Sequence, residues 1–272
     1  MSNSTKESLL KWAETELSRS GIESAKRETE LLLSRCSDIG LFQHLIKRRA
    51  SRYPLQYIVQ ETEFMGLPLK LKEGVFIPRP ETELLVEKIL EIMANTGDRT
   101  VDILEIGTGS GNIPISLTKN VTNCRIIASD ISDTALAIAS QNAEMNAVSE
   151  KIKFIKSDLF GNIPGIYLNY FDIIISNPPY VKRGEIKQLQ PEISYEDTSA
   201  LDGGCDGLDF YHNILGKGRR YLKTGGIFAF EIGYDQREAV AKIIGKYPEL
   251  GKAKSFKDYN GHDRIVIVEK HG

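Results

Sequence analysis

The sequence has few of the residues that build disulfide frameworks or metal sites. Its 272 residues include 3 cysteines, Cys36, Cys124 and Cys205, which lie far apart, and 4 scattered histidines. An odd number of isolated thiols argues against a disulfide scaffold and a zinc site, and favours a reducing compartment. We therefore predict no metal site and expect a cytoplasmic protein.

The chain also lacks a strong charge of one sign and a long apolar run. Its 35 basic and 37 acidic residues leave a formal net charge of −2, so there is no global electrostatic reason to bind nucleic acid. No apolar run is long enough to span a membrane, and residues 1–20 are polar and amphipathic, unlike a signal peptide. We expect a monomer that requires neither a membrane nor nucleic acid.

What is present is a helical region followed by an alternating α/β region. Leucines at helical spacing predict a small all-α domain over residues 1–60, and alternating apolar residues around a glycine predict a β-hairpin linker over 61–78. From 79 to 272 strand and helix patterns alternate, which predicts a doubly wound, Rossmann-like parallel sheet closed by an antiparallel C-terminal hairpin. The predicted strands are Val101–Ile106, Arg125–Ser129, Lys153–Ile155, Phe171–Ser176, Ile227–Glu231, Ala253–Phe256 and Arg264–Glu269.

A glycine-rich turn follows the first strand of this sheet. Alternate glycines over Gly107–Gly111 let the backbone turn tightly and let a ligand lie against it. The spacing is GxGxG, and Asn112 stands where the dinucleotide fingerprint requires its last glycine. The predicted cofactor-binding residues of this turn are Glu105, Gly107, Thr108, Gly109, Ser110 and Gly111.

Carboxylates follow the next two strands as well. Asp130 is placed to accept from both hydroxyls of a ribose, although it could instead cap the helix that starts near Ser132. Asp158 could accept from an adenine amino group while Leu159 covers the ring, or it could be an ordinary loop residue. With Glu105 facing an amino-bearing part of the ligand, three carboxylates and no arginine fit S-adenosylmethionine better than a pyrophosphate.

The most constrained stretch is Phe171–Tyr180, an apolar run that ends in Asn-Pro-Pro-Tyr. The run favours a buried parallel strand, and the prolines fix the turn after it, because each restricts the preceding residue and neither donates an N–H. The side chain of Asn177 and the carbonyl of Pro178 are therefore left as two acceptors beside the ring of Tyr180. The simpler interpretation is a strand that prolines terminate.

Such a turn suits a planar nitrogen that carries two hydrogens. Two fixed acceptors can hold this nitrogen in line with a methyl donor and disperse charge as it develops, without a general base. We predict that Asn177, Pro178 and Tyr180 are catalytic and that Asn177 also borders the cofactor. The predicted substrate-binding residues are Asn177, Pro178, Pro179 and Tyr180.

Four segments together resemble the HemK-type (PrmC-like) glutamine methyltransferases: Ile77–Glu83, Glu105–Gly111, Asn177–Tyr180 and Asp206–Tyr211. The resemblance covers nearly the whole chain. It implies transfer of a methyl group from S-adenosylmethionine, with S-adenosylhomocysteine as product, to the side-chain amide of the glutamine in the Gly-Gly-Gln motif of peptide chain release factors. It also implies that residues 1–60 recognise that protein substrate and that 79–272 form the methyltransferase domain.

Two other classes remain open from the residues alone. An amino-methyltransferase acting on adenine in DNA or RNA could use the same Asn-Pro-Pro-Tyr turn, but it needs a basic groove. The only basic run is Lys47–Arg52, which is either a solvated helix face or a patch for an acidic partner. A non-catalytic cofactor-binding protein would not need Asn177 held by two prolines.

Overall fold

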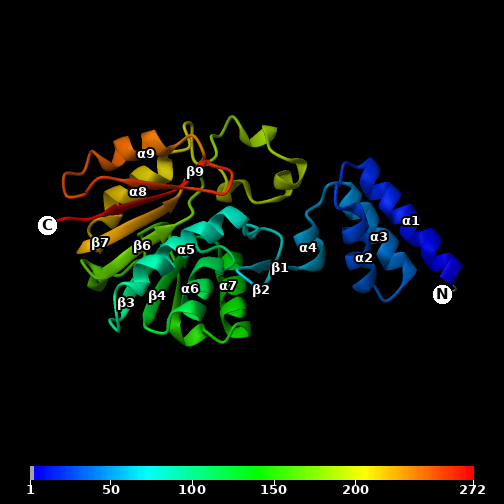
Figure 1. The fold of residues 1–272 in the computed structure, drawn as a ribbon, viewed down its shortest axis with the longest axis horizontal. Coiled ribbons are helices and arrows are strands. Elements are labelled where there is room, and N and C mark those ends of the chain that lie inside the picture. The colour runs from blue at the N-terminus through cyan, green and yellow to red at the C-terminus, as the bar shows by residue number, and fades with distance from the viewer. Residues whose placement is uncertain (1–2) are drawn as a thin grey trace.

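The computed structural model describes residues 3–272, with a helical bundle at one end and a larger α/β body at the other (Figure 1). The bundle consists of α1 (Asn3–Arg19), α2 (Ala25–Ser34) and α3 (Ile39–Ala50), which bury their own apolar core. A short helix, α4 (Leu55–Val59), leads out of it. The antiparallel strands β1 (Glu61–Phe64) and β2 (Leu67–Lys70) then form a hairpin that turns at Gly66, a glycine with a φ of 72°.

The larger body is built on a seven-stranded sheet in the order β5-β4-β3-β6-β7-β9-β8. The first five strands are parallel, and β9 runs antiparallel to both of its neighbours. This confirms the prediction of a doubly wound sheet closed by an antiparallel hairpin. The strands are β3 (Val101–Ile106), β4 (Cys124–Asp130), β5 (Ile152–Lys156), β6 (Phe171–Ser176), β7 (Leu222–Glu231), β8 (Lys254–Lys257) and β9 (Asp263–Glu269).

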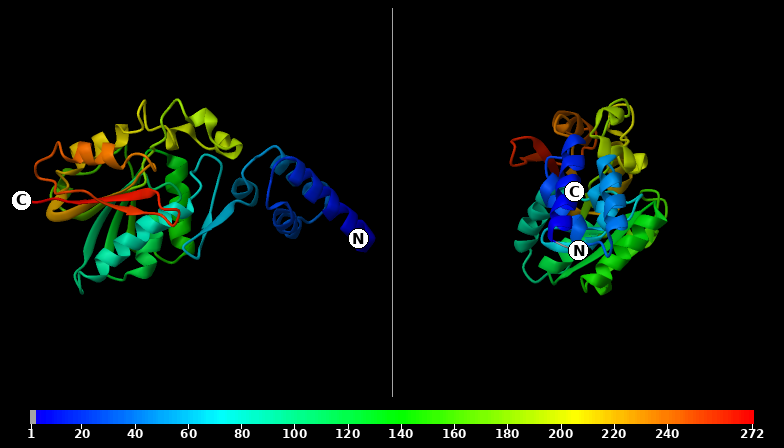
Figure 2. Two further views of the ribbon diagram at one scale, coloured as in Figure 1. Left: turned by 45° about the horizontal axis from the view of Figure 1, so that its top comes forward. Right: turned by 90° about the vertical axis from the view of Figure 1, so that its right-hand side faces the viewer.

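Helices cover both faces of the sheet, as the views from two further sides show (Figure 2). Their apolar residues bury against alternate residues of the strands, because side chains of a strand point to opposite faces with a period of two. On β6, for example, Ile173 and Ile175 pack with the cluster of α5 and α6, and Ile174 packs with the opposite cluster. The helices of this body are α5 (Pro80–Ala94), α6 (Asn112–Asn120), α7 (Asp133–Met145), α8 (Asp209–Gly218) and α9 (Arg237–Ile244).

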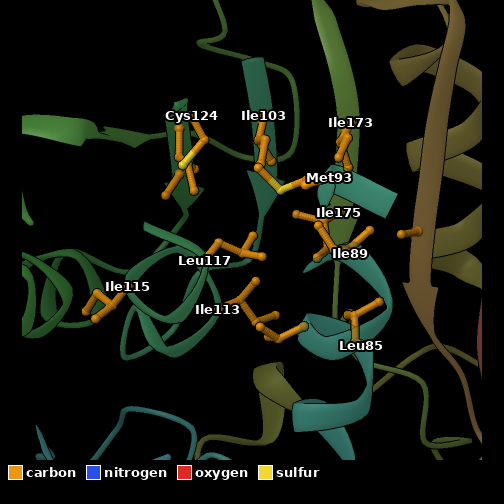
Figure 3. Packing of buried hydrophobic residues seen from close by; sticks show 14 of the residues in the cluster. Leu85, Ile89, Met93, Ile103, Ile113, Ile115, Leu117, Cys124, Ile173 and Ile175 are labelled. Atoms are coloured by element: carbon orange, nitrogen blue, oxygen red, sulfur yellow. The ribbon is translucent and has the colours of Figure 1, made fainter. Parts of the chain in front are cut away.

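The core on the α5 side fixes the position of that helix. Leu85, Ile89 and Met93 of α5 pack in one cluster with Ile103, Ile173 and Ile175 of the sheet, and Ile89 lies beside Ile175 (Figure 3). Burying a side chain of this size contributes about 1.5–3 kcal/mol, so three of them at helical spacing hold α5 firmly. The first turn of α5 is thereby placed at the carboxyl ends of the strands.

A long loop between β6 and α8 carries only short 3₁₀ helices, and it reaches back to the N-terminal bundle. Arg49 of α3 donates from Nη1 to Glu192 Oε1 at 3.0 Å, and Arg52 donates from Nη2 to Glu192 Oε2 at 2.8 Å. The hydroxyl of Tyr195 donates to the carbonyl of Ser51 at 3.0 Å. The 3₁₀ helices of this loop are Ile186–Gln188, Pro191–Tyr195 and Thr198–Ala200, and those elsewhere are Ser149–Lys151 and Gly165–Tyr167.

Candidate active site

A cavity of about 430 Å³ opens at the carboxyl ends of the parallel strands. Ligands of doubly wound sheets bind at this edge, and the volume lies within the range of small-molecule sites. Loops from β3, β4, β5 and β6 line it, together with the first turn of α5 and the loop that carries Leu189 and Ile193. Eleven of the predicted site residues meet there: Gly107, Thr108, Gly109, Ser110, Asp130, Asp158, Leu159, Asn177, Pro178, Pro179 and Tyr180. Glu105 and Gly111 do not line the cavity.

The three glycines of the loop after β3 have different tasks. Gly107 and Gly109 have φ values of 79° and 55°, and a Cβ at either would project into open space beside the cavity. Gly111 also has a positive φ, but a Cβ there would lie 3.1 Å from the Cβ of Ala139. The first two therefore allow the turn and keep room for a ligand, whereas Gly111 allows α6 and α7 to pack closely.

Asp130 at the end of β4 organises this loop. Its Oδ2 accepts from the backbone N–H of Gly109 at 2.8 Å, and its Oδ1 accepts from that of Ser132 at 2.9 Å. The N-cap of α7 is Ser132 itself, whose hydroxyl accepts from the N–H of Ala135 at 3.2 Å. Asp130 is thus not the helix cap, and because a carboxylate offers about four acceptor sites, it keeps capacity for hydroxyl donors in the cavity.

Glu105 lies behind the glycine loop and is fully buried. Its Oε2 accepts from the hydroxyl of Thr108 at 2.5 Å, while its Oε1 has no hydrogen-bond partner among the described residues. Burial raises the pKa of Glu105 to about 8, with a further contribution from the negative charge of Asp130. A buried acceptor without a donor is costly, and a cationic ligand in the neighbouring cavity would lower that cost.

The loop after β5 holds Leu159 in an unusual conformation. Its φ is 49°, in the left-handed region that branched apolar residues rarely adopt. The hydroxyl of Ser157 donates to the Leu159 carbonyl at 2.8 Å and accepts from the Asn162 N–H at 2.9 Å, which fixes the loop. Backbone strain of this kind concentrates at ligand sites, where it places a side chain that a relaxed loop would not present.

The Asn-Pro-Pro-Tyr turn follows β6 and faces the start of α5. Asn177 donates from Nδ2 to the hydroxyl oxygen of Thr82 at 3.1 Å. No described residue donates to Asn177 Oδ1 or to the Pro178 carbonyl, so both predicted acceptors are free within residues 3–272. The hydroxyl of Tyr180 donates to Glu231 Oε1 at 3.1 Å, which leaves its ring as the part that lines the cavity.

Thr82 and Glu231, which bond to the side chains of the Asn-Pro-Pro-Tyr turn, were not predicted as site residues from the sequence. Thr82 lines the cavity and donates to Glu231 Oε2 at 2.7 Å, and both side chains are buried with 1% relative exposure. Thr82 lies inside the Ile77–Glu83 segment, which was used for the family resemblance but in which no site residue was predicted. Glu231 is the last residue of β7. The sequence signal that could have identified it is a charged residue at the end of a buried strand.

Other kinds of site find no support in the described part of the chain. Residues 3–272 contain no group of three or more His, Cys, Asp or Glu side chains that could hold a metal ion. None of the helices described is long and apolar enough to cross a membrane. The sheet order, the glycine loop with its carboxylates, and the Asn-Pro-Pro-Tyr turn at one cavity together define a methyltransferase of the doubly wound class.

Comparison with known proteins narrows this class. A family model described as "Methyltransferase small domain" matches residues 72–205. The release factor glutamine methyltransferase of Fusobacterium nucleatum is 40% identical over 227 residues, which cover 83% of this chain and 62% of that relative. The one from Geobacter sulfurreducens is 36% identical over 279 residues, which cover 95% of this chain and 94% of that relative. The chain therefore belongs to the release factor glutamine methyltransferase family.

The solved structures agree on the fold. A structure described as a methyltransferase from Pyrococcus furiosus matches with a TM-score of 0.56 and 22% identity, covering 83% of this chain and 98% of that one. At this identity the likeness shows the fold alone. Family membership rests on the sequence relatives, and it confirms the resemblance drawn from the four sequence segments.

Proposed function

We propose that this chain transfers a methyl group from S-adenosylmethionine to the side-chain amide nitrogen of the glutamine in the Gly-Gly-Gln motif of peptide chain release factors. The observation that carries the proposal is the pair of free acceptors at the cavity, Asn177 Oδ1 and the Pro178 carbonyl. A primary amide has two N–H groups to give them. Relatives that carry this activity in their names cover nearly the whole chain.

The cavity suits S-adenosylmethionine in its chemistry. Asp130 would hold the ribose hydroxyls, Asp158 and Leu159 would bind the adenine, and the open space beside Gly107 and Gly109 admits the ligand against the backbone. The unpartnered oxygen of Glu105 lies behind Thr108 and favours a cationic ligand in front of it. When bound, the cofactor supplies an electrophilic methyl group on a sulfonium and leaves as S-adenosylhomocysteine.

The chain itself orients the substrate amide and needs no general base to do so. An amide nitrogen is a weak nucleophile because its lone pair is delocalised, and two acceptors that draw on its N–H groups raise its electron density. Tyr180 would pack its ring on the flat amide, since its hydroxyl is already bound to Glu231. No histidine lines the cavity among the described residues, so the proton is expected to leave to solvent after transfer.

The helical bundle over residues 1–60 is proposed to recognise the release factor. None of its residues that the structure describes lines the cavity. Its contacts with Glu192 and Tyr195 connect it to the loop that forms one cavity wall. We expect the protein to work in the cytoplasm as a monomer, with no requirement for nucleic acid.

The proposed function can be tested by mass spectrometry. The chain is incubated with a purified release factor and S-adenosylmethionine that carries a labelled methyl group, and the Gly-Gly-Gln peptide is sequenced. We expect label on that glutamine, and none on a release factor whose glutamine is replaced by glutamate. Label on adenine of added DNA or RNA, with unlabelled glutamine, would favour the amino-methyltransferase alternative.

Asp130→Ala is expected to weaken cofactor binding by about 2–3 kcal/mol, because it removes a charged acceptor and also frees the Gly109 N–H that shapes the loop. Calorimetry with S-adenosylhomocysteine measures the effect. Asp133→Ala is a matched control, since this carboxylate is exposed, pairs with Lys156 and does not line the cavity. Binding by Asp130→Ala within twofold of the wild type would contradict the assignment.

A further inference from the structure

Asn177 and Glu231 point to the same face of the sheet because of the strand register. Ser176, the last residue of β6, pairs with Phe230 of β7, and the residues that follow these two are Asn177 and Glu231. Phe230 packs in the cluster opposite to α5, and side chains alternate, which directs both following residues towards α5. Thr82 of α5 lies between them and contacts both.

Glu231, Thr82 and Asn177 are joined by two hydrogen bonds in a row. The direction of each bond follows from the protons that the three side chains can donate. An ionised Glu231 can only accept, so it takes the single hydroxyl proton of Thr82. The oxygen of Thr82 then has only acceptor capacity left for Asn177, which must present its NH₂ group. The carbonyl oxygen of the Asn177 amide is thereby turned towards the cavity.

We propose that Thr82 and Glu231 are positioning residues that set the orientation of the Asn177 amide, so that Oδ1 and not Nδ2 faces the substrate nitrogen. Without these hydrogen bonds the Asn177 amide can rotate and present its two N–H donors, which repel the N–H groups of a substrate amide. The inference rests on the proposed function for its catalytic consequence. The orientation of the Asn177 amide is a property of the protein without ligand.

Protonation of Glu231 would reverse the direction of these hydrogen bonds. Burial raises the pKa of Glu231 to about 7; the hydrogen bonds from Thr82 and Tyr180 oppose the rise. The other charged groups that act on it are Arg264, which lowers the pKa, and Glu81, which raises it. The hydroxyl of Tyr211 donates to the main-chain carbonyl of Glu231 at 3.0 Å and to Gln236 Oε1 at 3.3 Å, and not to the Glu231 carboxylate.

Once protonated, Glu231 can donate to Thr82, whose hydroxyl can then donate to Asn177 Oδ1. The correct orientation is therefore favoured above about pH 7 and is lost as the pH falls through the pKa of Glu231. The rate of methyl transfer should therefore fall as the pH is lowered through the pKa of Glu231, with the pH dependence of a single protonation. A general base on the substrate would give the same slope, so a measurement without substrate is needed.

The direct test is nuclear magnetic resonance of the side-chain amides in the ligand-free, ¹⁵N-asparagine-labelled chain. The Asn177 signal is assigned by its absence from Asn177→Ala. We expect it to titrate with a midpoint near pH 7 in the wild type and to lose this titration in Thr82→Val and in Glu231→Gln. An Asn177 signal that does not respond to pH or to either substitution would overturn the proposal.

The kinetic test compares variants of matched shape. Thr82→Val, which keeps the side-chain volume but removes the hydroxyl, should lower kcat by about tenfold or more with little change in cofactor affinity. Thr82→Ser restores the hydroxyl and should recover most of the loss. Thr118→Val is the control, because the Thr118 hydroxyl is buried but bonds only to carbonyls of its own helix.

The possible outcomes separate the two proposals. If the wild type does not methylate a release factor, the proposed function fails, while the amide titration still decides the orientation of Asn177. If the wild type is active and Thr82→Val keeps kcat within threefold, the positioning role is wrong. Circular dichroism and thermal melting identify a variant that fails to fold; if Thr82→Val does so, the Asn177 titration in Glu231→Gln decides.

Discussion

Replacing Asn177 by alanine is expected to lower the rate of methyl transfer by about 10²–10³-fold, the effect of removing one preorganised partner of a transition state. The side chain is held by Thr82, and its Oδ1 has no donor among the described residues, so its acceptor capacity is available to substrate. Single-turnover measurements with saturating cofactor report this step directly. The affinity for cofactor should change much less than the rate.

Two further variants show whether the lost group is an acceptor. Asn177→Asp keeps an acceptor oxygen and should retain more activity than Asn177→Ala. Asn213→Ala removes an exposed asparagine that bonds only to a carbonyl of α8, and it should leave the rate within twofold of the wild type. If Asn177→Ala lost less than tenfold, catalysis by fixed acceptors would be wrong.

The fold was accessible from sequence because each element carries its own periodic signal. Val101–Ile106 and Phe171–Ser176 are buried along their whole length and coincide with the predicted strands. Lys153–Ile155 was predicted as a three-residue strand, and the structure extends it by one residue at each end, to the buried Ile152 and the exposed Lys156. Strand ends depend on neighbours in the sheet, which the local pattern does not contain.

The same limit explains what was missed in the site. Residues after the strands could be predicted to meet, since parallel strands bring their carboxyl ends to one edge. The contact of Thr82 with Glu231 joins residues 149 positions apart and depends on how α5 packs. Tertiary partners of this kind leave no local pattern; only the burial of a charged residue hints at them.

The basic run Lys47–Arg52 shows how a local pattern can mislead. It was interpreted as a solvated face or as a patch for an acidic partner. Arg49 is instead buried, and it binds Glu28 inside the bundle as well as Glu192 of the cavity-wall loop. Arg52 binds the same Glu192. Much of the positive charge of this run is therefore neutralised within the chain.

Arg49 is accordingly expected to be critical for the stability of the N-terminal bundle. Its Nε donates to Glu28 Oε2 at 2.6 Å, and the two side chains are only 8% and 9% exposed. Removing one partner of a buried ion pair leaves an uncompensated buried charge, which costs about 3–5 kcal/mol. Replacing both partners by apolar residues avoids this cost, so the single substitution is the informative one.

Arg49→Met should therefore lower the free energy of unfolding of the bundle by about 3–5 kcal/mol. Because the bundle has its own apolar core, hydrogen exchange can follow it separately. The amides of α2 and α3 should lose protection, while those of β3 and β6 keep theirs. Glu192 would keep only its bond from Arg52, so the cavity-wall loop should also loosen and activity on a whole release factor should fall.

Arg35→Met provides the matched control for this substitution. It also replaces an arginine by methionine, in the ion pair between Arg35 and Glu61. The side chains of this pair are 45% and 46% exposed. Exposed pairs contribute about 0–1 kcal/mol, so this variant should stay close to the wild type in stability. Equal losses in Arg35→Met and Arg49→Met would show that burial does not set the contribution of Arg49. The connection between the bundle and the cavity wall would then have to rest on other contacts, such as that of Tyr195 with Ser51.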